Sequence, residues 1–300
     1  MEKKYKSDAK TKINMKKSLI KLLLFSSIVS NHIFNIQNLK AVVPFYYFPE
    51  TKNLKQEALS IGKQAYQLLL FGQIKDSLSL AKLAVKIDDK NEALWTTLAE
   101  AQIASKLYND ALISLNKAQK INPLKSEIYF AKSSIYLKQS KLKKAKISLQ
   151  SAIKLLPKNI NAIFQLGNIY LLEKNYEKAL EEFDKAIEIK KDFWQAINNK
   201  GLAYYELDKI NLAIISFKKA ISLEENAEPL LALGVCLTTR DINEAIFLAK
   251  KALVKNPNYV ENNYRKEQLW GEKLQSSTEK LFKDTQLKKQ VVFAKTKINY

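Results

Sequence analysis

The sequence predicts an all-α chain built as a solenoid of repeated helix pairs, and three observations carry this prediction. Small and large apolar residues recur every 34 positions through the middle of the chain, a period typical of stacked helical repeats. Glycine and proline number six each among 300 residues, which leaves little material for the tight turns of β-sheet folds. Apolar residues make up 47% of the chain, enough for an extended helical core.

The first 41 residues are expected to be a charged extension followed by a signal peptide or membrane-targeting segment. Lys16 and Lys17 precede an apolar run, LIKLLLFSSIV, and the small residue Ala41 follows, which is the order of a secretory signal. Polar residues interrupt every window long enough to span a bilayer, so we favour cleavage after Ala41 over a retained anchor. Residues 42–57 are expected to be a linker.

Residues 58–260 are expected to form six repeats, each of two antiparallel helices. Three columns recur with the 34-residue period: Ser77, Ala111, Ala145, Ala179 and Ala213; Ala81, Leu115, Leu149, Phe183 and Phe217; and Ala84, Ala118, Ala152, Ala186 and Ala220. Small side chains let helices approach closely, and the larger ones fill the gaps beside them. The expected repeats are 58–91, 92–125, 126–159, 160–193, 194–227 and 227–260.

These columns resemble the tetratricopeptide-repeat (TPR) family. Repeat 160–193 carries the family pattern in Leu166, Gly167, Tyr170, Ala179, Phe183 and Ala186. The resemblance covers about two-thirds of the chain and implies a right-handed superhelical solenoid of helix-turn-helix repeats. In the sixth repeat, Gly234 and Ala245 fit frames that differ by one residue, so the turn between its helices is expected to be one residue shorter.

Residues 261–284 are expected to form a C-terminal capping helix, because a solenoid needs an end that tolerates water. Its apolar face would consist of Tyr264, Leu269, Trp270, Leu274 and Leu281. The stretch KEQLWGEKLQ resembles the C-terminal cap of a group of cyanobacterial TPR proteins that also carry AVVP-type N-termini. Residues 285–300 are expected to be a frayed basic tail.

The TPR resemblance implies a concave groove, lined by the first helix of each repeat, that receives a protein or peptide partner. The groove residues carried over to this sequence are Phe130, Phe164, Asn168, Gln195, Asn198, Asn199 and Tyr205. Aromatic rings can bury a partner's side chains, and amides can pair with an extended backbone. Packing within the array for Phe130 and Phe164, and simple solvation for Asn168 and Asn199, are the alternatives. A clamp for acidic chaperone tails is disfavoured, because Phe164 stands where that clamp has a lysine.

No catalytic constellation occurs in the sequence, so an enzyme is not expected. The single Cys236 and the single His32 can form neither an internal disulfide nor a zinc site, and no cofactor or metal is expected. Cys236 lies among leucines and is expected to be a buried apolar residue. The net charge of +20 is almost all lysine. With Arg240 and Arg265 as the only arginines, nucleic acid is not an expected partner.

The expected function is a non-enzymatic scaffold for protein–protein interaction. We expect it to be exported to a periplasm or thylakoid lumen, or to be membrane-associated, and to act as an assembly or chaperone-like factor for an envelope or thylakoid complex. The alternative is a cytoplasmic adaptor attached to the membrane surface by its N-terminus. The role as an assembly factor rests on analogy with other TPR proteins.

Overall fold

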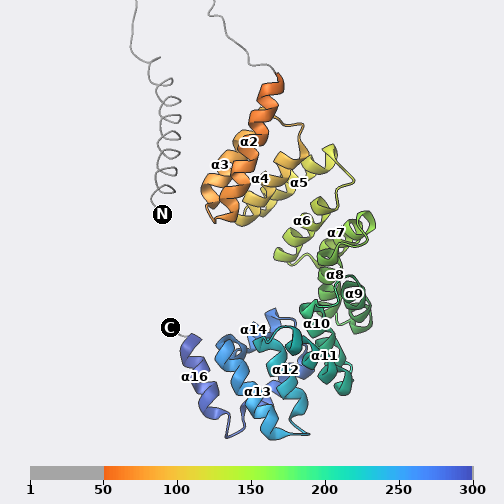
Figure 1. Cartoon of the computed structure of the whole chain (residues 1–300), viewed down its shortest axis with the longest axis vertical. Coiled ribbons are helices and arrows are strands. Elements are labelled where there is room, and N and C mark those ends of the chain that lie inside the picture. Colours follow the sequence, from red (N-terminus) through yellow and green to blue (C-terminus); the bar gives the residue numbers. More distant parts are fainter. Residues whose placement is uncertain (1–50, 299–300) are drawn as a thin grey trace, which may run out of the picture. The chain divides into compact units, whose positions relative to one another are not determined.

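The computed structural model describes residues 51–298, which form helices and the short turns between them (Figure 1). This part of the chain contains fifteen α-helices, one short 3-10 helix and no strand. None of these helices is both long and apolar enough to cross a lipid bilayer. The expected extension and signal peptide lie outside the described residues. The expected linker ends earlier than residue 57, because the first helix begins at Thr51.

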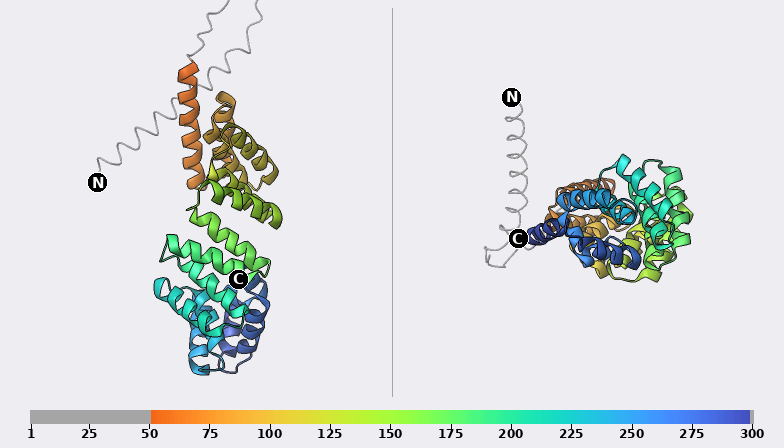
Figure 2. Two further views of the ribbon diagram at one scale, coloured as in Figure 1. Left: turned by 90° about the vertical axis from the view of Figure 1, so that its right-hand side faces the viewer. Right: turned by 90° about the horizontal axis from the view of Figure 1, so that it is seen from below.

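Twelve of the helices form six consecutive pairs, and each helix packs most closely on its own pair partner (Figures 1 and 2). The first helices of the pairs are α2 (Thr51–Leu70), α4 (Glu92–Ala104), α6 (Ser126–Lys138), α8 (Ile160–Leu172), α10 (Trp194–Glu206) and α12 (Ala227–Leu237). The second helices are α3 (Ile74–Ile87), α5 (Tyr108–Ile121), α7 (Leu142–Leu155), α9 (Tyr176–Ile189), α11 (Ile210–Leu223) and α13 (Ile242–Lys255). The all-helical solenoid expected from the 34-residue period is confirmed.

The recurring small residues let the helices of a pair approach each other. Ala145 and Ala179 are completely buried, as are the larger residues of the middle column. Gly167 lies so close to Phe183 that an added Cβ would be 2.6 Å from the ring. A side chain at this glycine would therefore push the ring out of the core.

The turn inside each of the first five pairs has one residue in the left-handed backbone region. These residues are Gly72, Lys106, Ser140, Lys174 and Asp208, with φ angles between 56° and 73°. In the second pair, the N–H of Leu107 bonds to the carbonyl of Gln102 at 2.8 Å, the long bond of a Schellman turn. The sixth pair lacks such a residue, and its expected shorter turn is wrong. Four residues, 238–241, separate its helices, against three in each of the other pairs, and α12 has 11 residues instead of the 13 of α4, α6, α8 and α10.

The C-terminal part differs from the expected single capping helix over 261–284. It consists of a 3-10 helix, η1 (Pro257–Val260), and of α14 (Asn262–Glu267), α15 (Glu272–Phe282) and α16 (Lys288–Ile298). The break after α14 follows from Leu269, whose φ of 66° cannot continue a helix. The expected frayed tail over 285–300 is also corrected. Residues 288–298 are helical because Leu287 and Ala294 are buried against the core.

Candidate functional site

The inner surface of the stack is formed by the first helices of the pairs. α2 contacts α4, α4 contacts α6, α8 contacts α10, and α10 contacts α12. Neighbouring first helices lie this close because they are on the concave side of a curved stack, as Figures 1 and 2 show. The residues expected to line a groove all lie on α6, α8 or α10.

The C-terminal segment covers this inner surface over the last three pairs. α15 contacts both α10 and α12. Its first turn has no capping side chain of its own, since Gly271 is at the N-cap position. Instead, the buried carboxylate of Glu206 on α10 accepts hydrogen bonds from the backbone N–H of Leu274 at 2.9 Å and of Lys273 at 3.3 Å. A carboxylate at this end of a helix satisfies free N–H groups and complements the helix dipole.

Gly271 is required where α10 and α15 meet. A Cβ added to this glycine would lie 2.2 Å from the Glu206 side chain. The Lys273 ammonium completes the contact by donating to the backbone carbonyl of Glu206 at 2.8 Å. A further ion pair joins Lys174 and Glu272 at 2.7 Å, but both side chains are exposed, so its contribution to stability is small.

Leu269 and Trp270 hold the segment that precedes α15. Leu269 packs against the core formed by α8, α9 and α10. Trp270 is buried, and its indole Nε1 donates to the Glu228 carboxylate on α12 at 3.0 Å. We call residues 268–282 the inner segment. It fills the inner surface of the fourth to sixth pairs as a bound peptide would.

A ladder of side-chain amides runs along the inner surface beneath this segment. Asn199 Nδ2 donates to Asn168 Oδ1 at 2.8 Å, and Asn198 Nδ2 donates to Asn199 Oδ1 at 3.1 Å. Asn198 also contacts the carboxyl group of Glu228. The ladder therefore links α8, α10 and α12 through polar contacts between neighbouring pairs.

The partly buried Glu228 side chain is the charged end of this ladder. Burial raises the pKa of its carboxyl to about 7, an effect that hydrogen bonds from Trp270, Asn198 and Tyr259 partly oppose. No lysine or arginine forms an ion pair with it in the described part of the chain. The group is thus an acid that can change charge near neutral pH.

The structure separates the seven residues predicted for the groove into two groups. Asn198, Asn199 and Tyr205 are buried, and Tyr205 lines a pocket together with Ser277 and Leu281 of the inner segment. The other four, which are partly exposed, are Phe130, Phe164, Asn168 and Gln195. Phe164 mainly packs within the array: its ring centroid is 4.9 Å from that of Phe193 and 5.8 Å from that of Phe183.

An open cleft lies at the start of the inner segment, between α6, α8 and Leu269. Its volume is about 640 Å³. Apolar side chains of Leu137, Leu172 and Leu269 line it, together with the polar side chains of Ser134 and Asn168. The cleft is thus built partly by the repeats and partly by the C-terminal segment.

The inner surface continues toward the N-terminus over α2, where three large apolar residues are exposed. Leu59, Tyr66 and Leu70 are 38%, 44% and 68% exposed. Their spacing of seven and four residues places them on one face of the helix. Exposed apolar residues grouped in this way are typical of an interaction surface.

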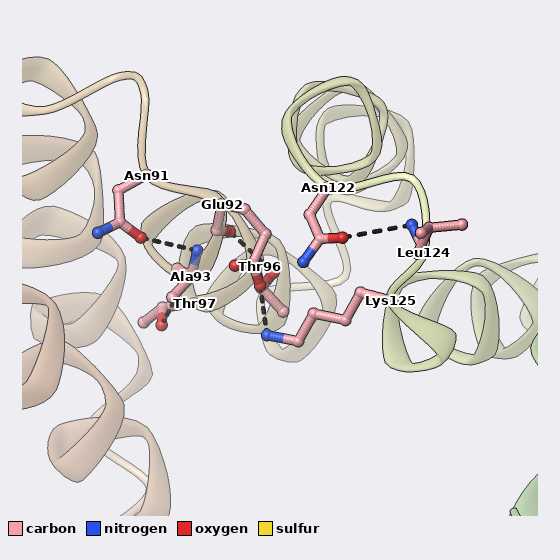
Figure 3. A network of polar contacts seen from close by, with 8 residues as sticks. All are labelled: Asn91, Glu92, Ala93, Thr96, Thr97, Asn122, Leu124 and Lys125. Carbon is pink, nitrogen blue, oxygen red and sulfur yellow. Dashed lines mark hydrogen bonds and ion pairs between the residues drawn. The ribbon is translucent and has the colours of Figure 1, made fainter. Parts of the chain in front are cut away.

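Polar contacts fix the junction between the second and third pairs (Figure 3). Lys125, just before α6, forms an ion pair with Glu92 at the start of α4. The hydroxyl of Thr96 donates to the Glu92 backbone carbonyl at 3.0 Å. Asn91 and Asn122 accept backbone N–H bonds within their own turns at 2.9 and 3.3 Å. These polar groups thus have partners within the chain.

Sequence reasoning missed Glu206 and Gly271 as parts of the inner surface. The Trp270–Gly271 pair was a usable signal, because a bulky anchor followed by glycine is suited to close packing on another helix. The buried state of Cys236 is confirmed, and burial raises the pKa of its thiol to about 12. Among residues 51–298, no group of three or more His, Cys, Asp or Glu side chains is placed to hold a metal ion.

Comparisons with known proteins agree with this architecture. A model of the TPR repeat matches residues 167–208, and a model of the tetratricopeptide repeat matches residues 126–159 and 195–226. Among solved structures, the chain is similar to a MamA protein at 28% identity, over 58% of this chain and 93% of that chain, with a TM-score of 0.51. No curated protein matches the sequence.

Two further solved structures share the fold at lower identity. The pilF protein of Pseudomonas aeruginosa is 16% identical over 73% of this chain and 99% of that chain, with a TM-score of 0.60. YrrB, described as a TPR protein with an unusual peptide-binding site, is 19% identical over 61% of this chain and 96% of that chain, with a TM-score of 0.50. The helix pairs, their packing and these matches together identify the chain as one that contains tetratricopeptide repeats in a TPR solenoid.

Proposed function

We propose that this chain is a non-enzymatic scaffold that holds a segment of a partner protein on the open inner surface between α2 and α8. The observation that carries this proposal is the inner segment itself. Over the last three pairs, the inner surface already holds an extended turn and a helix through a buried tryptophan and a carboxylate that caps backbone N–H groups. Over the first pairs, the same kind of surface has no such cover within the described residues.

The open surface favours a partner that inserts apolar side chains. Tyr66 and Leu70 are exposed on α2, and Leu137 and Leu269 line the cleft. Asn168 adds an amide that can pair with a backbone group of the partner. YrrB, by its description, binds peptides at an unusual site, which supports peptide binding on this fold without fixing its place here.

The test compares two double variants of the full chain in a pull-down from the native host. Tyr66→Ala with Leu70→Ala removes exposed apolar groups from the inner surface. Ile113→Ala with Ile147→Ala removes residues that are 59% and 63% exposed on the second helices, which face away from it. We expect partners to be lost with the first variant and kept with the second, while circular dichroism shows the same helix content. Equal recovery with both variants would contradict binding on the inner surface.

The cellular setting is a separate part of the proposal. The chain acts as an assembly or chaperone-like factor for an envelope or thylakoid complex, exported or bound to a membrane, and the alternative is a cytoplasmic adaptor that touches the membrane through its N-terminus. The order of charges and apolar residues before Val42 supports export. Sequencing the N-terminus of the mature protein tests it. A new terminus near Val42 supports export, and an intact N-terminus supports the adaptor. If nucleic acid co-purified with the chain in a stoichiometric amount, the proposal that its partner is a protein would be contradicted.

A further inference from the structure

The C-terminal end of the stack exposes large apolar side chains on two neighbouring helices. On α13, Phe247 and Val254 are 62% and 65% exposed, and their spacing of two helical turns places them on one face. On α16, Val292 and Phe293 are also exposed. α13 and α16 contact each other at this end of the chain (Figure 1).

Lysines surround these apolar side chains. Lys250 lies between Phe247 and Val254, and a shallow hollow of about 580 Å³ is lined by Phe247, Lys250, Lys251, Val254 and Lys255. The lysines of α16 are Lys288, Lys289, Lys295 and Lys297, and no acidic residue occurs after Asp284. Glu225 pairs with Lys251 and Lys255, whereas Lys250 and the lysines of α16 form no ion pair in the described part of the chain.

Other second helices also expose apolar residues beside lysines. On α11, Leu212 and Ile215 are 42% and 63% exposed, and Lys218 and Lys219 follow them without an ion pair in the described part of the chain.

Ile147 is 63% exposed and is the one large apolar residue of α7 with an exposed side chain. One lysine beside it, Lys146, pairs with Glu173 at 2.7 Å. α9 has the acidic residue Glu181 at the corresponding position of its repeat. The C-terminal end differs from these helices because each of its two helices has an exposed phenylalanine, Phe247 on α13 and Phe293 on α16, whereas α3, α5, α7, α9 and α11 expose none.

We propose that the C-terminal face, formed by Phe247, Val254, Val292, Phe293 and the lysines around them, binds the surface of an anionic phospholipid membrane. Apolar side chains flanked by lysine are the features of helices that lie in the headgroup region of a bilayer. The positive charge of these lysines complements the negative surface potential of a membrane that contains anionic lipids. This contact is separate from any made by the N-terminal segment and from the partner on the inner surface.

The test places an environment-sensitive dye on the C-terminal face of the full chain. Cys236 is the only cysteine, and it is buried with a pKa of about 12, so it reacts slowly with a thiol-directed dye. Phe247→Cys and Phe293→Cys therefore give single labelling sites, and Ile147→Cys gives a control whose side chain is exposed to a similar extent. The N-terminal segment can bring every variant to a vesicle, but only contact of the C-terminal face moves these two dyes into lipid.

We expect a blue shift of the dye at positions 247 and 293 with vesicles of phosphatidylcholine and phosphatidylglycerol, and no shift at position 147. Replacing Lys250, Lys288 and Lys289 by glutamine should raise the lipid needed for half of the shift at position 293 by about tenfold or more. Three results with vesicles overturn the proposal: no shift at 247 and 293, an equal shift at 147, or an equal shift with phosphatidylcholine alone. A shift without vesicles that grows with protein concentration would instead identify a second copy of this chain as the occupant, and also overturns it.

Discussion

Replacing Glu228 by glutamine is expected to stabilise the protein, and to do so more at pH 8 than at pH 5. The Glu228 side chain is partly buried near the start of α12, where Trp270 Nε1 donates to it at 3.0 Å. Burial raises the pKa of the carboxyl to about 7 from 4.5. Glutamine keeps an oxygen that can accept the Trp270 hydrogen bond, and it removes the charge that burial disfavours.

The direction of the pH effect follows from the two pKa values. Between about pH 4.5 and pH 7 the folded protein binds more protons at Glu228 than the unfolded chain does. The free energy of unfolding therefore falls as pH rises through this window and is constant above it. One pKa unit corresponds to about 1.4 kcal/mol. Because solvent reaches part of the side chain, we expect the advantage of Glu228→Gln over the parent to grow by about 1 to 2 kcal/mol between pH 5 and pH 8.

Urea unfolding followed by circular dichroism measures this difference, with the slope of the transition compared between proteins to check that unfolding exposes the same surface. Glu181→Gln, an exposed position on α9, controls for the loss of one negative charge. If Glu228→Gln has the same advantage at both pH values, or none, the buried carboxyl is not the source of the pH dependence and the reasoning is wrong.

Three further changes test the packing. Lys106→Gly should raise the free energy of unfolding by about 0.5 to 1 kcal/mol, because Lys106 has a φ of 60° that glycine adopts without strain; urea unfolding checks it. Gly271→Ala should cost about 1 to 3 kcal/mol, because the added Cβ meets Glu206, and hydrogen exchange should rise first in α15. Ala179→Leu should cost a similar amount by overpacking a completely buried position, seen as a lower melting temperature.

The architecture of the repeats was predictable because the helix pairs share one pattern of small and large apolar residues. Small residues at fixed spacing allow close contacts between helices. The period of 34 residues is visible in the sequence alone. The expected boundary between the second and third repeats, at residue 126, is where α6 begins. The change of frame between Gly234 and Ala245 was assigned to a shorter turn, but it comes from the first helix: α12 has 11 residues, and the turn after it has four.

The C-terminal part was less predictable because its sequence does not follow the 34-residue pattern of the helix pairs. The apolar spacing of residues 264–281 is compatible with one helix, and the break at Leu269 depends on contacts with α8 and α10 that lie far away in the sequence. Residues 288–298 read as a basic tail because lysines dominate their composition. Leu287 and Ala294 nevertheless bury enough surface to hold a helix against the core.

The same long-range contacts explain why three of the seven residues predicted for the groove are buried. The repeat pattern assigns Asn198, Asn199 and Tyr205 to the inner surface, but it says nothing of what covers them.

The inner segment also forms part of the open cleft, because Leu269 is one wall of that cleft. Asn168 lies both in the cleft and in the amide ladder. A partner in the cleft would therefore touch both the repeats and the C-terminal segment. Deleting that segment would remove a wall of the binding site and expose the core at once, so a truncated chain cannot separate binding from folding. Single changes at exposed positions such as Tyr66 and Leu70 can, because they alter the inner surface and leave the core packed.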